Sequence, residues 1–120
     1  MRHADIEKFC LSLTGSTLTV QWGGERVYKV GGKMFAMLGA KADKPHHLFF
    51  KAGEGSFHIL THVRHIIPAP YLARAQWVYL QRLDALATNE LKVYLARAHR
   101  QVALALPKKK RMGLGIPEAP

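Results

Sequence analysis

The chain has 120 residues, of which 48% are hydrophobic and 22% charged, so we expect one soluble domain with a substantial core. No stretch approaches the roughly 20 consecutive apolar residues that cross a bilayer, and the charged N-terminal segment is unlike a signal peptide. The single cysteine excludes an internal disulfide and a cysteine-based metal site. We therefore expect a cytoplasmic protein without a membrane partner.

The charge balance is the most informative part of the composition. Eighteen Lys and Arg residues against eight Asp and Glu residues give a formal net charge of +10. A surplus of this size on a small domain favours polyanions as partners, nucleic acid first. The alternative is that the charge serves solubility alone.

An N-terminal helix is predicted over residues 3–13. Its apolar residues recur at the spacing of one helical face: Ile6, Phe9, Cys10 and Leu13. Cys10 is then a buried structural thiol rather than a nucleophile. Gly15 is expected to end the helix in a left-handed conformation, and alternating β-branched residues predict a strand over 17–22.

A hairpin is predicted around Gly31-Gly32, because a two-residue type I′ turn needs positive φ at both central positions. Its strands are residues 26–30 and 33–38, so that Tyr28 faces Phe35 across the ribbon. Lys29 and Lys33 lie near the tip. We expect the hairpin to be rooted in the core and to project into solvent.

Further elements follow the polar loop after the hairpin. Residues 47–51 predict the fourth strand of an antiparallel meander. Ser56 is predicted to cap a helix over 57–65. The two prolines of 66–72 predict an extended segment, and residues 76–80 predict a last strand.

The clearest helix is expected to begin at its N-cap Thr88 and to end at Pro107. Its buried stripe consists of Leu91, Leu95, Ala98, Val102 and Leu106. Residues 1–107 thus form a single domain, and residues 108–120 a basic, flexible tail. The expected fold class is α+β, an antiparallel meander sheet of about five strands backed by three helices.

Three segments of the chain resemble those of a known protein family. The segments that carry the resemblance are YKVGGKMFAML, IIPAPYLARAQWVYL and a final helix ending in LPKK, in that order. They are similar to the MmcQ/YjbR family of small bacterial proteins. The resemblance implies a CyaY/frataxin-like two-layer sandwich and a DNA-binding protein with a double-wing motif. It implies no catalytic residues and no cofactor.

The first candidate site is a basic surface that contacts phosphates without reading sequence. Its members on the hairpin and neighbouring segments are Arg26, Lys29, Lys33, Lys41, Lys44 and Lys51. The run Lys108, Lys109, Lys110 and Arg111 is either a phosphate-gripping arm or a solubilising helix cap. The alternative is a scattered set of solvated cations. Five arginines are alternative members of this surface, and the sequence does not indicate where they lie in the fold: Arg64, Arg74, Arg82, Arg97 and Arg100.

Three histidines form a second candidate, because His58, His62 and His65 would share one side of the predicted helix. Imidazoles at i and i+4 can share a metal. The segment lacks the glutamate of an HExxH site, so partly exposed histidines that gain charge at low pH are the preferred interpretation.

A third candidate is a groove lined by Pro68, Pro70, Tyr71 and Trp77. Such a block more often forms a rigid turn and fills a core, and Trp22 and Trp77 are both expected to be core residues.

The chain contains no nucleophile elbow, phosphate loop or dinucleotide fingerprint. The net charge of +10, together with the DNA-binding role that the family resemblance implies, leads us to expect non-enzymatic DNA binding through phosphates. The alternative is a small-ligand or protein-interaction module that uses the groove near Pro68–Trp77.

Overall fold

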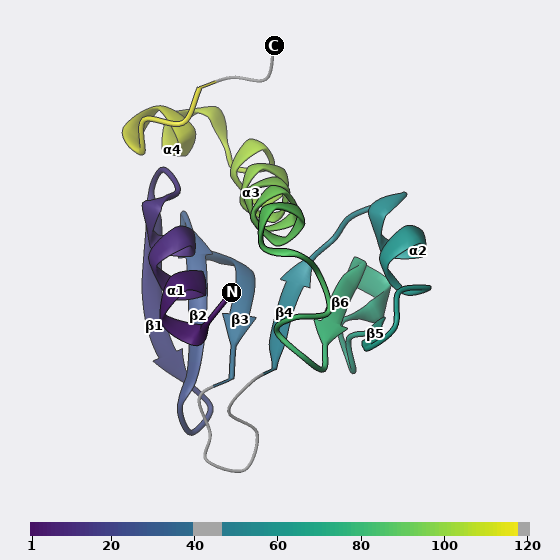
Figure 1. The fold of residues 1–120 in the computed structure, drawn as a ribbon. Coiled ribbons are helices and arrows are strands. Elements are labelled where there is room, and N and C mark those ends of the chain that lie inside the picture. Colours follow the sequence, from purple (N-terminus) through teal and green to yellow (C-terminus); the bar gives the residue numbers. More distant parts are fainter. Residues whose placement is uncertain (40–46, 118–120) are drawn as a thin grey trace.

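A computed structural model describes residues 1–39 and 47–117 (Figure 1). One antiparallel sheet contains all six strands of this part of the chain, in the order β1-β2-β3-β4-β6-β5. The strands are β1 (Ser16–Gln21), β2 (Glu25–Val30), β3 (Lys33–Leu38), β4 (Leu48–Lys51), β5 (Ile66–Pro68) and β6 (Trp77–Leu80). The helices are α1 (His3–Ser12), α2 (Ser56–Leu60), α3 (Thr88–Leu104) and α4 (Lys108–Gly113), with a 3₁₀ turn η1 (Ala73–Ala75).

The core lies between one face of the sheet and the helices α1 and α3 (Figure 1). The strand register aligns Tyr28, Ala36, Phe50 and Val78 in one row across four strands, and all four are fully buried. Side chains alternate between faces along a strand, so this row forms a continuous apolar surface under the helices. The predicted α+β class with a meander at its centre is confirmed.

Both long helices present the predicted apolar faces. Ile6 and Cys10 of α1 are fully buried, and Phe9 packs against the core at its edge. In α3 the stripe from Leu91 to Val102 is buried as expected. Burying a leucine side chain contributes roughly 1.5–3 kcal/mol, so these faces hold the helices on the sheet.

The Gly31-Gly32 turn forms as predicted, with φ values of 59° and 81°. Val30 pairs with Lys33, and Lys29 with Met34. The register then shifts, so Tyr28 pairs with Ala36 and the predicted Tyr28–Phe35 pair is wrong. A β-bulge inserts one residue into β3, which leaves Phe35 without a cross-strand partner.

The middle of the chain differs most from the prediction. α2 ends at Leu60 instead of residue 65, and Ser56 is its first residue rather than its cap. His65 has a φ of 69°, which is incompatible with a continuing helix. The extended segment that follows contains a sixth strand, β5. Pro68 is tolerated there because β5 is an edge strand.

Two further expectations are wrong. Trp22 is 58% exposed in the β1–β2 turn rather than in the core, whereas Trp77 is buried as expected. Residues 108–113 form α4 and Ile116 is 8% exposed within the core cluster, so this part of the predicted flexible tail is folded onto the domain. No helix of residues 1–39 and 47–117 has the length and apolar character needed to cross a membrane.

Candidate nucleic-acid interface

The structure brings the two predicted basic segments together. A Cβ atom at Gly31 would lie 2.5 Å from Cδ1 of Leu106, so the tip of the β2–β3 hairpin packs against the end of α3. Lys110 Nζ lies 4.0 Å from the Cβ position at Gly32. The hairpin tip is therefore docked against the α3–α4 junction, and the expectation that it projects alone into solvent is wrong.

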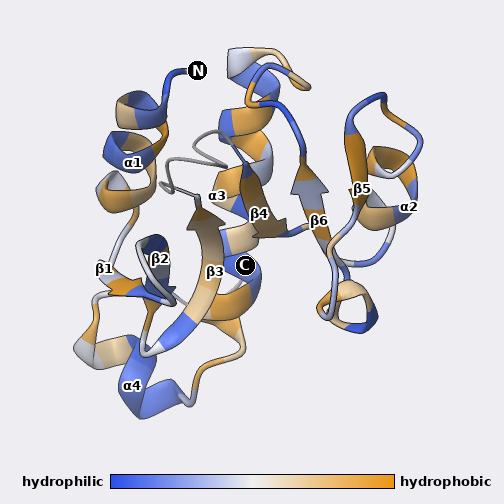
Figure 2. Ribbon diagram, turned by 90° about the horizontal axis from the view of Figure 1, so that it is seen from below, coloured by the Kyte–Doolittle hydropathy of each residue, from blue (hydrophilic) through white to orange (hydrophobic). Residues whose placement is uncertain are grey.

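We call the resulting surface the basic end. Its cations come from the tip of the hairpin, the end of β4 and the helix α4: Lys29, Lys33, Lys51, Lys108, Lys109, Lys110 and Arg111. Lys33 and the three lysines of α4 are exposed, whereas Lys29, Lys51 and Arg111 are half-buried. Figure 2 shows the hydrophilic helix α4 beside the hydrophilic start of β3.

Arg26 does not belong to this surface. It lies at the other end of β2, about 13 Å along the strand from Val30. Its Nε donates a hydrogen bond to Oε1 of Glu7 over 2.6 Å, and this contact raises the pKa of Arg26. Tyr28 also donates to the same oxygen, so Arg26 is part of a structural cluster between β2 and α1. Lys41 and Lys44 lie outside the described residues.

A pocket of about 400 Å³ opens within the basic end. β3 pairs with β4 only from Ala36 to Leu38, so the Lys33 end of β3 separates from Lys51 and leaves space between them. The end of α3 closes this space from one side. The lining residues are Lys33, Met34, Lys51, Leu72, Ala75, Trp77, Gln101, Val102, Ala105, Leu106 and Pro107.

Gln101 fixes one wall of this pocket. Its side-chain amide donates to the carbonyl oxygens of Ala52, over 3.0 Å, and of Lys51, over 3.4 Å. A Cβ at Gly53 would collide with the Gln101 side chain. Glycine at residue 53 thus permits the close approach that ties α3 to the end of β4.

The predicted groove near Pro68–Trp77 is only partly assembled. Trp77 lines the pocket of the basic end, together with Leu72. Pro68 and Pro70 are exposed and do not line it, and Tyr71 is fully exposed with a φ of 66°. The residues predicted for phosphate binding and for the groove therefore meet at Lys33, Lys51 and Trp77.

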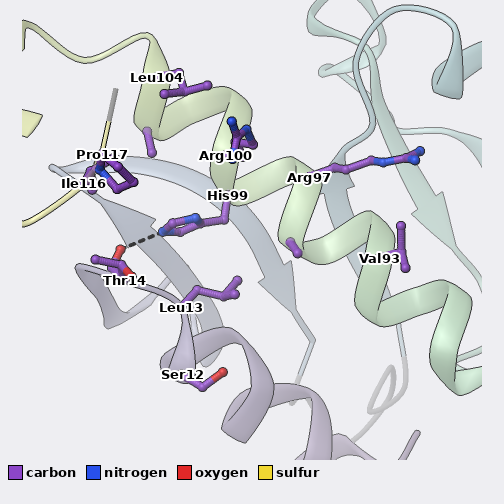
Figure 3. A pocket seen from close by; sticks show the side chains of 12 residues that line it. Ser12, Leu13, Thr14, Val93, Arg97, His99, Arg100, Leu104, Ile116 and Pro117 are labelled. Atoms are coloured by element: carbon purple, nitrogen blue, oxygen red, sulfur yellow. Dashed lines mark hydrogen bonds between the residues drawn. The ribbon is translucent and has the colours of Figure 1, made fainter. Parts of the chain in front are cut away.

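A second pocket of about 520 Å³ lies between the end of α1, the helix α3 and the segment Ile116–Pro117 (Figure 3). Arg97 and Arg100 project from α3 along its rim, whereas His99 points inward and donates from Nε2 to the carbonyl oxygen of Thr14 over 2.7 Å. His99 is a buried residue that was not predicted, although it lies four residues after Leu95 on the buried side of α3. That spacing was the available signal.

The second face of the sheet carries an aromatic cluster that was not predicted. His47 Nε2 and Glu25 Oε2 lie 3.3 Å apart, and both residues are more than nine-tenths buried. The Phe49 and Tyr79 rings pack edge to face, 4.5 Å apart. Burial and the nearby Glu25 carboxylate raise the pKa of Tyr79. This cluster lies at the end of the sheet opposite the basic end.

The three histidines do not share one helical side, because α2 ends before His62. The Nδ1 of His62 lies 2.7 Å from the carbonyl oxygen of His58, which occupies one of the nitrogens that a metal would need. Among residues 1–39 and 47–117 no group of three His, Cys, Asp or Glu side chains is arranged to hold a metal ion.

The comparisons with known proteins agree on the family. The YjbR family model matches residues 11–101. The crystal structure of the Deinococcus radiodurans protein DR2400, with the domain DUF419, has a TM-score of 0.83 at 25% sequence identity, over 98% of this chain and 90% of that chain. No curated protein matches the chain. The resemblance inferred from the sequence motifs is confirmed: the chain belongs to the YjbR family.

Proposed function

We propose that the protein binds nucleic acid, DNA in the first instance, through phosphate contacts made by the basic end. The observation that supports this most directly is that the Gly31-Gly32 turn packs against Leu106 and lies near Lys110. It joins two cationic segments that are far apart in the sequence into one surface. A cluster of cations on one face attracts a phosphate backbone more strongly than the same charges dispersed.

The proposed contacts supply affinity rather than sequence readout, because phosphates carry no base information. α3 packs its apolar stripe onto the sheet, so the buried side of the longest helix is committed to the core. The proposal contains no catalytic step. The double-wing arrangement that the family resemblance implies belongs to the same proposal, with the β2–β3 hairpin as one wing docked against α4.

The salt dependence of duplex DNA binding tests the proposal. If four cations of the basic end contact phosphates, affinity should fall about 100-fold between about 50 and about 200 mM salt. Lys33→Glu/Lys110→Glu should lower affinity and reduce the slope of log affinity against log salt by about two. The matched control is Lys8→Glu/Arg64→Glu, which changes the net charge equally at exposed residues away from this surface.

Absence of binding at micromolar protein and low salt would refute the proposal. An equal loss of affinity in both double variants would show that net charge alone matters and that the basic end is not the contact surface.

A small-ligand site is the second candidate, because the pocket beside Trp77 is partly enclosed and largely apolar. If the wild type binds no nucleic acid, this candidate replaces the first, and titration of small organic anions with Trp77 fluorescence as readout is its test.

A further inference from the structure

Phosphate contacts require only exposed cations, yet the basic end also contains an apolar pocket. Its floor is formed by Met34, Leu72, Trp77 and Val102, and Lys33 and Lys51 supply its positive charge. Its volume of about 400 Å³ lies in the range of pockets that hold small organic groups. The pocket therefore combines a place for an apolar ring with a place for an anion.

The walls of this pocket are set by the fold. The β3–β4 pairing stops at Ala36 and Phe50, and the Gln101 amide holds the backbone of Ala52 in place. Such a pocket exists before any ligand arrives, which lowers the entropy cost of binding.

We infer that this pocket receives an unpaired nucleobase, with Lys33 and Lys51 bound to the phosphates on either side of it. The inference rests on the proposed function and adds to it a preference for single-stranded over duplex nucleic acid. A nucleobase is planar with apolar faces, and its phosphate lies a short distance from the ring, which matches an apolar pocket beside two ammonium groups. A base within a duplex must first be unpaired and unstacked before it can enter such a pocket.

Trp77 fluorescence can report on the pocket directly. The chain has two tryptophans, and Trp22→Phe leaves Trp77 as the single tryptophan, which is excited selectively over tyrosine at long wavelength. We expect the fold to tolerate this change, because Trp22 is exposed in the β1–β2 turn. We expect oligothymidylate to change Trp77 emission and to bind about tenfold more tightly than a duplex of equal length at the same salt. We expect free thymidine monophosphate to bind far more weakly than the oligonucleotide.

A blocking variant separates the pocket from the surrounding charge. Ala75 and Ala105 are exposed residues that line the pocket, so Ala75→Leu/Ala105→Leu narrows it without removing a cation. We expect this variant to lose about tenfold in affinity for the oligonucleotide and to keep its affinity for the duplex. Ala4→Leu, an exposed alanine on α1, is the matched control and should change neither.

Equal affinity for single strands and duplex, or an equal effect of the blocking variant on both, would overturn this inference while leaving phosphate binding intact. Equally tight binding of thymidine monophosphate and the oligonucleotide would also overturn it, because the pocket would then serve free nucleotides. Failure of the wild type to bind either nucleic acid would remove the proposed function itself.

Discussion

Arg26 donates a hydrogen bond from Nε to Oε1 of Glu7 over 2.6 Å, and this ion pair joins β2 to α1. Tyr28 donates to the same carboxylate oxygen over 3.2 Å. The Glu7 side chain is only 23% exposed, and these two donors replace part of the water that its carboxylate oxygens would otherwise bind. Arg26 was predicted to contact DNA phosphates, but in the structure its side chain helps to hold α1 on the sheet.

Arg26→Ala should therefore affect stability and not DNA binding. Loss of the charged donor should cost about 1 kcal/mol in the free energy of unfolding, since the pair is partly screened by solvent. Urea titration measures this loss, and duplex binding at fixed salt should stay within about twofold of the wild type. If Arg26→Ala lost more DNA affinity than the Lys33→Glu/Lys110→Glu variant, DNA would contact the Arg26 end of β2 and not the basic end.

The free energy of unfolding should fall at alkaline pH because the Cys10 thiol and the Tyr28 hydroxyl are buried in their protonated forms. Burial, with the nearby Glu7 carboxylate, raises the pKa of Cys10 from 9.0 to about 12 and raises the pKa of Tyr28 as well. The folded state keeps protons that the unfolded chain releases, so stability is full below pH 9 and is lost as pH rises from about 9 toward 12.

Cys10→Ala isolates the contribution of the thiol. Each proton held in this way adds a slope of up to about 1.4 kcal/mol per pH unit. The variant should be less stable than the wild type at pH 7 but should show a shallower decline above pH 9, measured by urea titrations across the range. Parallel pH profiles of the two proteins would contradict the assigned origin.

The Gly31-Gly32 turn provides a matched pair of substitutions. Both glycines have positive φ, but a Cβ at Gly31 meets Leu106 whereas a Cβ at Gly32 meets only the end of Lys110. Gly32→Ala should cost roughly 1–2 kcal/mol from the backbone alone, and Gly31→Ala about 3 kcal/mol because it adds a steric clash.

Leu106→Ala should remove this difference. In that background Gly31→Ala and Gly32→Ala should cost similar amounts, as judged from a double-mutant cycle of unfolding free energies. A difference that persists would mean that the hairpin tip does not rest on Leu106.

Trp22→Asn should be tolerated and should stabilise the protein by up to about 1 kcal/mol. Trp22 has a φ of 48°, and asparagine adopts this left-handed conformation with less strain than a bulky aromatic. Thermal unfolding measures the effect. A loss above about 1 kcal/mol would show that the exposed ring contributes packing that outweighs its backbone strain.

The sequence predicts local features of this fold well where one physical signal dominates. The paired glycines determine the turn and the Lys29–Met34 register, and the spacing from Leu91 to Val102 determines the buried side of α3. Both signals depend on residues close in the chain, so no tertiary information is needed.

The failures occur where distant contacts decide. The bulge displaces Phe35 from its predicted partner, and the Phe35 ring instead packs edge to face against His99 of α3, with 5.2 Å between the ring centroids. α4 carries four consecutive cations, which repel one another, and the segment is held in place by the burial of Ile116. The residues around Phe35 do not indicate a bulge, and the residues of α4 do not indicate that this helix docks on the domain.

The candidate site shows the same division. Residue type and net charge lead to the prediction that Lys33, Lys51 and Lys110 contact phosphates, and the block around Pro68 leads to the prediction that Trp77 lines a groove. Their assembly in one place depends on the separation of β3 from β4 and on the Gln101 contact to Ala52. No spacing in the sequence encodes that assembly.

Lys110 Nζ lies near the Gly32 turn, and this placement bears on when the basic end is completed during synthesis. Chains fold from the N-terminus during synthesis, so the β1–β4 meander can form while α4 has not yet been made. The hairpin tip can pack against Leu106 and Lys110 only after these residues have been synthesised. Their docking closes a long loop of chain, which has an entropy cost. A nascent chain thus carries its sheet before its complete cationic surface.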